Sequence, residues 1–214
     1  MVGEAIALMV VAARRSGGGF WCGLAASLVA GLPFPAQGRT VQPVTGPAPA
    51  ERLVANGPCR DGVPNGAYEL RMPDGRMRVL GAYAKGRRTG TFLFWASTGA
   101  RIAVIPYEDD VKTGTVALWR APAIRTGEPR RKLESAYSGG VLHGFTRSWH
   151  ANGKPRAEYR YERGELAEAQ AWSEEGAALP EPAARSLAVR DRANDANLYA
   201  EFEKIVAENL PRCQ

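Results

Sequence analysis

Residues 83–99 read YAKGRRTGTFLFWASTG, and residues 137–153 read YSGGVLHGFTRSWHANG. Each stretch begins with a tyrosine, with a glycine three positions later and a second, opening glycine seven positions later. A tryptophan stands five positions beyond the opening glycine, and a closing glycine stands nine positions beyond it. Glycines that bracket an aromatic segment indicate a strand between two tight turns.

The same spacing recurs along residues 59–176, which contain about five units. The opening and closing glycines are Gly66, Gly75, Gly90, Gly99, Gly114, Gly144 and Gly153. The tyrosine position is held by Tyr83, Tyr107, Tyr137 and Tyr161 and, in the first unit, by Cys59. The tryptophan position is held by Trp95, Trp119, Trp149 and, counted back from Gly176, Trp172. Repetition at one period is typical of repeat architectures.

The length of the unit predicts a β-hairpin. Spacings of 23 or 24 residues, with 30 between Trp119 and Trp149, are too short for two packed helices and suit two strands with two turns. Asp74-Gly75 and Asn152-Gly153 favour type I′ turns, which need positive φ at both central residues. We therefore expect a mainly β fold, in which residues 58–178 form an antiparallel hairpin meander in a single elongated sheet. The extra residues between Trp119 and Tyr137 predict one enlarged, protruding tip.

This pattern resembles the MORN repeat, and more closely the bacterial variant found in proteins described as YwqK-like antitoxins. The resemblance covers residues 59–176 and is clearest in the two stretches quoted above. It implies an antiparallel hairpin meander, and the family label implies a toxin-neutralising role. The usual aromatic residue two positions after the opening glycine is present as Tyr68 and Phe92 but is replaced by Val116 and Thr146. We therefore expect looser packing in the third and fourth units.

Side-chain alternation divides the aromatic residues between the two faces of the expected sheet. Phe92 and Trp95 are an odd number of residues apart, so they point to opposite faces. A two-residue turn would pair Trp95 with Ile102 and Trp149 with Arg156, the second pair as a cation–π contact. The tryptophan row then has two interpretations: it is core beneath the C-terminal helix, or it faces solvent and binds a partner.

Residues 179–214 change period and predict an amphipathic helical cap. Their apolar residues recur at three- and four-residue steps and are Leu198, Tyr199, Phe202, Ile205, Val206 and Leu210. Asp195 is the expected N-cap and Pro211 the expected stop. One apolar stripe needs a surface to cover, and the open face or the end of the sheet provides it.

Residues 1–38 read as an export signal. Arg14 and Arg15 precede an apolar run from Phe20 to Leu32, which is too short to span a bilayer and suits a signal peptide cleaved near Gly38. A retained anchor in the inner membrane is the alternative, and translation starts at Met1 or Met9. Residues 39–57 form a Pro/Ala-rich linker. Both interpretations place the remainder in the periplasm or outside the cell.

Cysteines in an oxidising compartment commonly form disulfides. Cys22 lies inside the expected signal, so Cys59 and Cys213 remain as an even pair, and we expect a disulfide between them. Two cysteines and the isolated His143 and His150 are too few for a zinc site. We therefore expect no metal and no cofactor.

The composition and motifs favour binding over catalysis. The chain has 28 Lys and Arg against 22 Asp and Glu, a net charge of +6 that is too mild for a dedicated nucleic-acid binder. It contains no nucleophile elbow and no phosphate loop. Glu108, Asp109 and Asp110 read as a solvated turn in which Asp110 replaces a glycine. We expect a non-enzymatic protein.

The basic residues gather at two expected hairpin tips. Lys85, Arg87 and Arg88 belong to one, and Arg125, Arg130, Arg131 and Lys132 belong to the enlarged one. Two hypotheses follow. The preferred one is an exported protein that offers its sheet to a protein partner, as in toxin neutralisation or immunity. The alternative is an envelope-associated module that contacts lipid headgroups or peptidoglycan through its basic tips. Export disfavours nucleic acid.

Overall fold

The computed structural model describes residues 52–122 and 129–213. The expected signal or anchor, the choice of start codon and most of the linker lie outside these residues, as does Arg125 at the enlarged tip. In the described part the fold is mainly β with one C-terminal helix, which confirms the predicted class. None of the described helical structure is long and apolar enough to cross a membrane.

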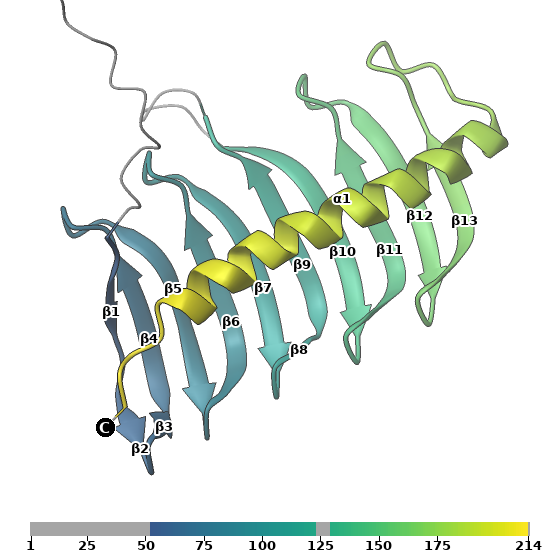
Figure 1. Cartoon of the computed structure of the whole chain (residues 1–214). Coiled ribbons are helices and arrows are strands. Elements are labelled where there is room, and N and C mark those ends of the chain that lie inside the picture. Colours follow the sequence, from purple (N-terminus) through teal and green to yellow (C-terminus); the bar gives the residue numbers. More distant parts are fainter. Residues whose placement is uncertain (1–51, 123–128, 214) are drawn as a thin grey trace, which may run out of the picture. The chain divides into compact units, whose positions relative to one another are not determined.

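The described residues form thirteen strands and one helix, labelled in Figure 1. Their bounds are β1 Val54–Asn56, β2 Cys59–Arg60, β3 Val63–Pro64, β4 Gly66–Arg71, β5 Met77–Ala84, β6 Arg87–Trp95, β7 Arg101–Glu108, β8 Val111–Lys112, β9 Gly114–Arg120, β10 Arg130–Ser138, β11 Val141–Trp149, β12 Pro155–Glu162, β13 Glu165–Ala171 and α1 Glu181–Glu208.

The sheet is a meander, as predicted. Its strand order is β1-β4-β5-β6-β7-β9-β10-β11-β12-β13, and every pairing is antiparallel. The short β8 pairs with β7, and β2 and β3 form a separate two-stranded sheet. Each unit therefore contacts the units next to it in the sequence. For this reason the spacing of residues along the chain predicts the strand order.

The type I′ turns lie at the opposite ends of the hairpins from those predicted. At Asp74-Gly75 only the glycine has positive φ, 86°, and its N–H donates to the Met72 carbonyl at 2.9 Å. This is a type I turn followed by a left-handed glycine. Positive φ at both central residues occurs at the tyrosine end, for example at Lys85-Gly86 with 50° and 80°. The type I′ prediction for the Asp-Gly and Asn-Gly pairs was therefore wrong.

A β-bulge at the start of each return strand changes the predicted cross-strand partners. Trp95 pairs with Arg101 and Trp149 pairs with Pro155, where Ile102 and Arg156 were predicted. The register shifts by one residue beside each tryptophan, because an extra residue is inserted in the return strand. The insertion turns Arg156 toward the helix, where its Nη1 lies 2.6 Å from Asp191.

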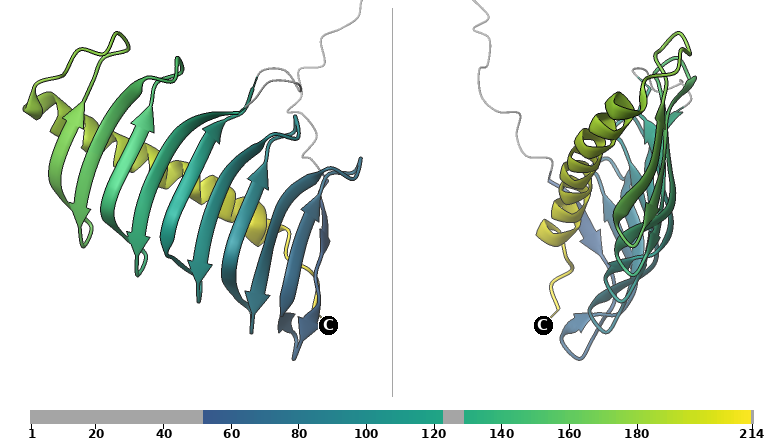
Figure 2. Two further views of the ribbon diagram at one scale, coloured as in Figure 1. Left: turned by 180° about the vertical axis from the view of Figure 1, so that it is seen from behind. Right: turned by 90° about the vertical axis from the view of Figure 1, so that its right-hand side faces the viewer.

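Helix α1 begins at Glu181 with Pro180 as N-cap, so the prediction of Asp195 as N-cap was wrong. A proline at the first turn is tolerated, and Pro182 therefore does not interrupt the helix. The helix forms a second layer on one face of the sheet and runs obliquely across the strands (Figure 2). Its buried residues are Ala184, Ala188, Tyr199, Phe202 and Val206.

Two apolar clusters hold the helix to the sheet. The larger involves β4 to β10 and the C-terminal half of α1, where Phe94 and Phe202 have ring centroids 4.7 Å apart. The smaller joins β12 and β13 to Ala184 and Ala188. Beyond the helix, Cys213 forms the predicted disulfide with Cys59.

No tryptophan of the described residues belongs to either cluster. Phe92 and Phe94 face the helix, and Trp95 has the opposite parity on the same strand, as predicted. The interpretation of the tryptophan row as core beneath the helix is therefore wrong. The helix packs on the face that carries Phe92 and the repeat tyrosines. The tryptophans lie on the opposite face, which no other element among the described residues covers and which we call the uncovered face.

Candidate functional site

The uncovered face carries an alternating row of indoles and guanidinium groups. The guanidinium carbon of Arg101 lies 5.1 Å from the Trp119 ring centroid. That of Arg131 lies 5.5 Å from Trp119 and 5.8 Å from Trp149, and Arg131 also forms an ion pair with Glu134. We call the set the tryptophan–arginine row; in strand order it comprises Trp95, Arg101, Trp119, Arg131, Trp149, Pro155 and Trp172.

The register of the hairpins builds this row. Trp95 pairs with Arg101, and Trp119 pairs with Arg131, each immediately before the bulge of its hairpin. Each arginine is thereby set on the same face as its partner indole. All four tryptophans of the row are partly exposed. Cation–π contacts at such sites contribute about 0.5–1 kcal/mol each, so the row also holds its own side chains in place.

A groove of about 470 Å³ opens at the end of the row, between Trp149 and Trp172. Pro155 lies in it, together with Lys154, Arg147 and Glu158. Arg147 donates from Nε to Oε2 of Glu158 at 2.6 Å.

A second row of cross-strand pairs on the same face is apolar in its first part and charged in its second. From β5 to β9 the paired residues are Leu80, Leu93, Val104 and Ala117, and from β10 to β12 they are Glu134, Arg147 and Glu158. Phe145 nearby is 44% exposed, and Arg147 lies 4.9 Å from its ring. One part of the face is thus apolar and the other is charged and paired.

The structure separates the predicted basic tips. Lys85 lies at a tyrosine-end turn, whereas β10 begins at the opposite ends of the hairpins (Figure 1). Arg88 is already bound: its Nε lies 2.9 Å from Asp110, and its guanidinium carbon lies 4.2 Å from the Tyr107 ring. Arg131 belongs to the tryptophan–arginine row. The structure therefore does not gather these residues into a single basic patch.

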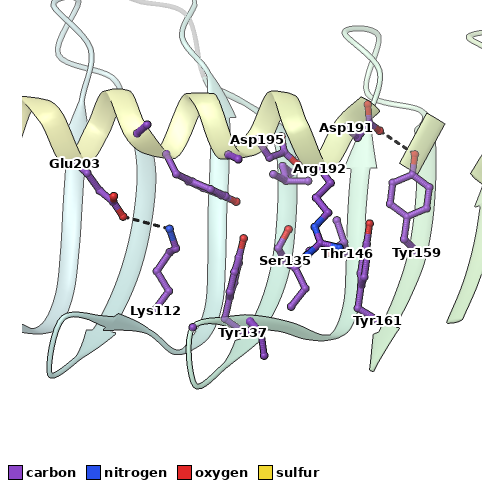
Figure 3. Close-up of a pocket in the computed structure, with 17 residues that line it drawn as sticks. Lys112, Ser135, Tyr137, Thr146, Tyr159, Tyr161, Asp191, Arg192, Asp195 and Glu203 are labelled. Carbon is purple, nitrogen blue, oxygen red and sulfur yellow. Dashed lines mark hydrogen bonds and ion pairs between the residues drawn. The ribbon is translucent and has the colours of Figure 1, made fainter. Parts of the chain in front are cut away.

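A cavity of about 270 Å³ lies on the other face, between α1 and strands β10 to β12 (Figure 3). In the second unit Phe92 fills the space between Tyr83 and Tyr107, at centroid distances of 5.7 and 5.4 Å. The fourth unit has Thr146 at this position, and the space between Tyr137 and Tyr161 stays open. The expectation of loose packing thus holds there. In the third unit the corresponding Val116 is fully buried and belongs to the larger apolar cluster.

Polar groups of the helix and the sheet converge on this cavity. The Asp191 carboxylate accepts hydrogen bonds from Arg156 at 2.6 Å and from the Tyr159 hydroxyl at 2.8 Å. Burial, reinforced by the charge of Asp191, raises the pKa of Asp195 to about 6. Burial also raises the pKa of Tyr137 to about 12. The Thr146 hydroxyl is buried and has no hydrogen-bond partner in the structure.

A lysine already lies among the aromatic rings at one side of the cavity. The Lys112 amine is 4.8 Å from the Tyr199 ring and 5.9 Å from the Tyr137 ring. It also forms an ion pair with Glu203 at 3.2 Å. A cation of the protein therefore already lies beside these rings, paired with Glu203.

The remaining candidate residues are in turns or on strand ends. Asp109 and Asp110 have φ of 47° and 69° and form the central residues of a turn, as predicted. His143 accepts a hydrogen bond at Nδ1 from the Arg163 N–H, at 3.3 Å. The Nε2 atom of His150 lies 2.9 Å from the Trp172 carbonyl oxygen.

Sequence reasoning missed Arg101, and it assigned Arg131 to a basic hairpin tip rather than to a position between two indoles. The signal was present for Arg101, which stands two positions after the closing Gly99, as Pro155 stands two positions after Gly153. Predicting this position requires the bulged register. A two-residue turn without a bulge places the residue three positions after the closing glycine, Ile102, opposite Trp95.

Comparisons of the chain with protein-family models, with curated proteins and with solved structures find no match.

Proposed function

We propose that the protein is a non-enzymatic binding protein whose uncovered sheet face binds a protein partner through the tryptophan–arginine row. The observation that carries this proposal is the position of Arg131 between Trp119 and Trp149, on the face opposite the helix. Tryptophan and arginine are enriched among the residues that dominate the binding energy of protein interfaces. Side chains held by a sheet and by each other lose little freedom on binding.

Toxin neutralisation or immunity in the periplasm or outside the cell is the form of this function that we propose, as a member of the MORN-variant group that the repeat resembles. The Cys59–Cys213 disulfide supports an exported protein, since disulfides persist mainly in oxidising compartments. The alternative, an envelope module that contacts anionic lipid or peptidoglycan through basic tips, finds less support. Its arginines are divided between the two ends of the hairpins, and Arg88 is engaged by Asp110.

The test compares two single variants of the whole chain in capture from envelope extract. Trp119→Ala removes the indole that contacts both Arg101 and Arg131. Val189→Ala is the control, because Val189 is 68% exposed on the helix, away from this face. We expect the first variant to lose the captured protein and the second to retain it. Equal capture by both would contradict the proposal. Loss of binding to anionic vesicles in Lys85→Glu/Arg87→Glu, with Trp119→Ala unaffected, would favour the alternative.

A further inference from the structure

The tryptophan–arginine row has one interval between indoles that contains no arginine. Arg131 lies between Trp119 and Trp149, within 6 Å of both ring centroids at 5.5 and 5.8 Å. In the next interval, between Trp149 and Trp172, the residue paired with the indole is Pro155. The groove of about 470 Å³ lies in this interval.

We propose that the groove between Trp149 and Trp172 binds an arginine side chain that a protein partner supplies. The inference rests on the proposed function and names the group that this face recognises. Arg131 lies between Trp119 and Trp149, each on a neighbouring strand. The partner's guanidinium would lie in the same way between Trp149 and Trp172. A planar, weakly hydrated guanidinium stacks on aromatic rings at lower desolvation cost than an ammonium group does.

The groove offers one carboxylate acceptor to a cation of this shape, beside two cations of its own, Arg147 and Lys154. Glu158 lines it, and Arg147 engages only Oε2 of that carboxylate, which leaves Oε1 as an acceptor for a second guanidinium. The Lys154 amine donates to the Glu175 carbonyl at 3.1 Å and keeps its charge, so the acceptor and the two indoles must outweigh this cation. Pro155 contributes no charge and no long side chain to the groove.

The probe is the peptide acetyl-Gly-Arg-Gly-amide, titrated into the ¹⁵N-labelled whole chain. The matched control peptide carries citrulline, which has the shape of arginine without its charge. Indole N–H signals are assigned by single Trp→Phe variants. We expect saturable shifts of the Trp149 and Trp172 signals with a dissociation constant in the millimolar range, and binding of the citrulline peptide weaker by about fivefold or more.

Two variants, each two positions after the closing glycine of a unit, test the site further. Pro155→Arg supplies the missing guanidinium from the chain itself and should abolish the shifts. Met77→Arg installs an arginine in the first unit, opposite Arg71 and beside no tryptophan on that strand pair, and should leave peptide binding intact. Circular dichroism checks that both variants keep the fold. If Pro155→Arg unfolds the chain, Trp172→Ala replaces it, with the same expected loss at the Trp149 signal.

Several outcomes would overturn the inference. They are equal binding of the citrulline peptide, shifts confined to Trp95 and Trp119, and no shift at any indole. Self-association of the chain that Pro155→Arg abolishes would assign the groove to a second copy and overturn it as well. A captured partner that requires Trp119 but still binds Pro155→Arg would leave the proposed function intact while rejecting the arginine site, so the two failures are distinguishable.

Discussion

Ser135 and Thr146 are cross-strand partners on β10 and β11, and both are buried beneath the helix, with 2% and 5% of their surface exposed. The same row carries Phe92 and Ile105 in the second unit, where the space under the helix is filled. The pair therefore marks the gap between the two apolar clusters. A polar cavity in this place weakens the docking of the middle of the helix, since buried polar groups without partners are costly.

Replacing Thr146 by valine should stabilise the protein. The substitution keeps the shape of the side chain and removes a buried hydroxyl that has no partner. We expect the free energy of unfolding to rise by about 1 kcal/mol in urea titration. The matched reverse change, Val116→Thr at the same phase of the third unit, should lower it by about 1–3 kcal/mol. A fall in stability for Thr146→Val would show that the hydroxyl has a partner that the structure lacks.

Asp195 should make the protein more stable as pH falls, which is the opposite of the usual effect of a carboxylate. Its pKa is raised from 3.8 to about 6 by burial and by Asp191, while Lys132 and Arg156 lower it. Because the folded state binds the proton more tightly, this residue adds stability as pH falls from about 7 to about 4, by at most about 3 kcal/mol.

The Asp195→Asn variant isolates this contribution. Asparagine carries no charge to desolvate, so the variant should be more stable than the parent at pH 7, and the difference should shrink toward pH 4. Groups such as Asp110, whose pKa is lowered and whose effect on stability has the opposite sign, are common to both proteins and cancel in the comparison. A difference that stays constant between pH 4 and pH 7 would reject the raised pKa.

Reduction of the disulfide should weaken the whole fold. Cys59 and Cys213 are separated by 154 residues, so the bond restricts most of the unfolded chain. On the chain-entropy model this corresponds to about 3–5 kcal/mol. We expect Cys59→Ser/Cys213→Ser to lose stability of this order in urea, and the parent protein in reductant to match the variant. Unchanged stability on reduction would contradict the pairing.

Asp110 should tolerate glycine better than alanine. Its φ is 69°, and its Oδ1 accepts hydrogen bonds from the N–H and the Nε of Arg88, both at 2.9 Å. Asp110→Gly loses the side-chain bonds but accepts the left-handed backbone, whereas Asp110→Ala loses the bonds and adds strain of about 1 kcal/mol. Urea titration of the two variants gives the difference directly. Equal stability would mean that the turn relaxes to another conformation.

The spacing of glycines and aromatic residues was sufficient to predict the meander, because each unit pairs only with its neighbours. Alternation was likewise sufficient to separate Phe92 from Trp95. The turn types were predicted at the wrong ends, since an Asx-Gly pair also fits a type I turn with a left-handed glycine, and the sequence does not distinguish the loop lengths. The bulges at Ile102 and Arg156 follow from that longer loop.

The candidate sites depend on features that periodicity does not report. The helix was predicted from its apolar stripe, which begins near Leu198, but the fully buried residues of its first turns are the small Ala184 and Ala188. These pack on the last strands because of their size, so the start at Glu181 was missed. The place of Arg131 between two indoles required the bulged register of the folded hairpin.

The most direct test of the central claim, that the uncovered face binds the partner, is oxidative footprinting of the free chain and of its complex, read by mass spectrometry. We predict that Trp95, Trp119, Trp149 and Trp172 are oxidised in the free chain and protected in the complex, while exposed residues of the helix such as Val189 keep their reactivity. Protection of the helix or of the basic tips, with the four indoles unchanged, would contradict the account.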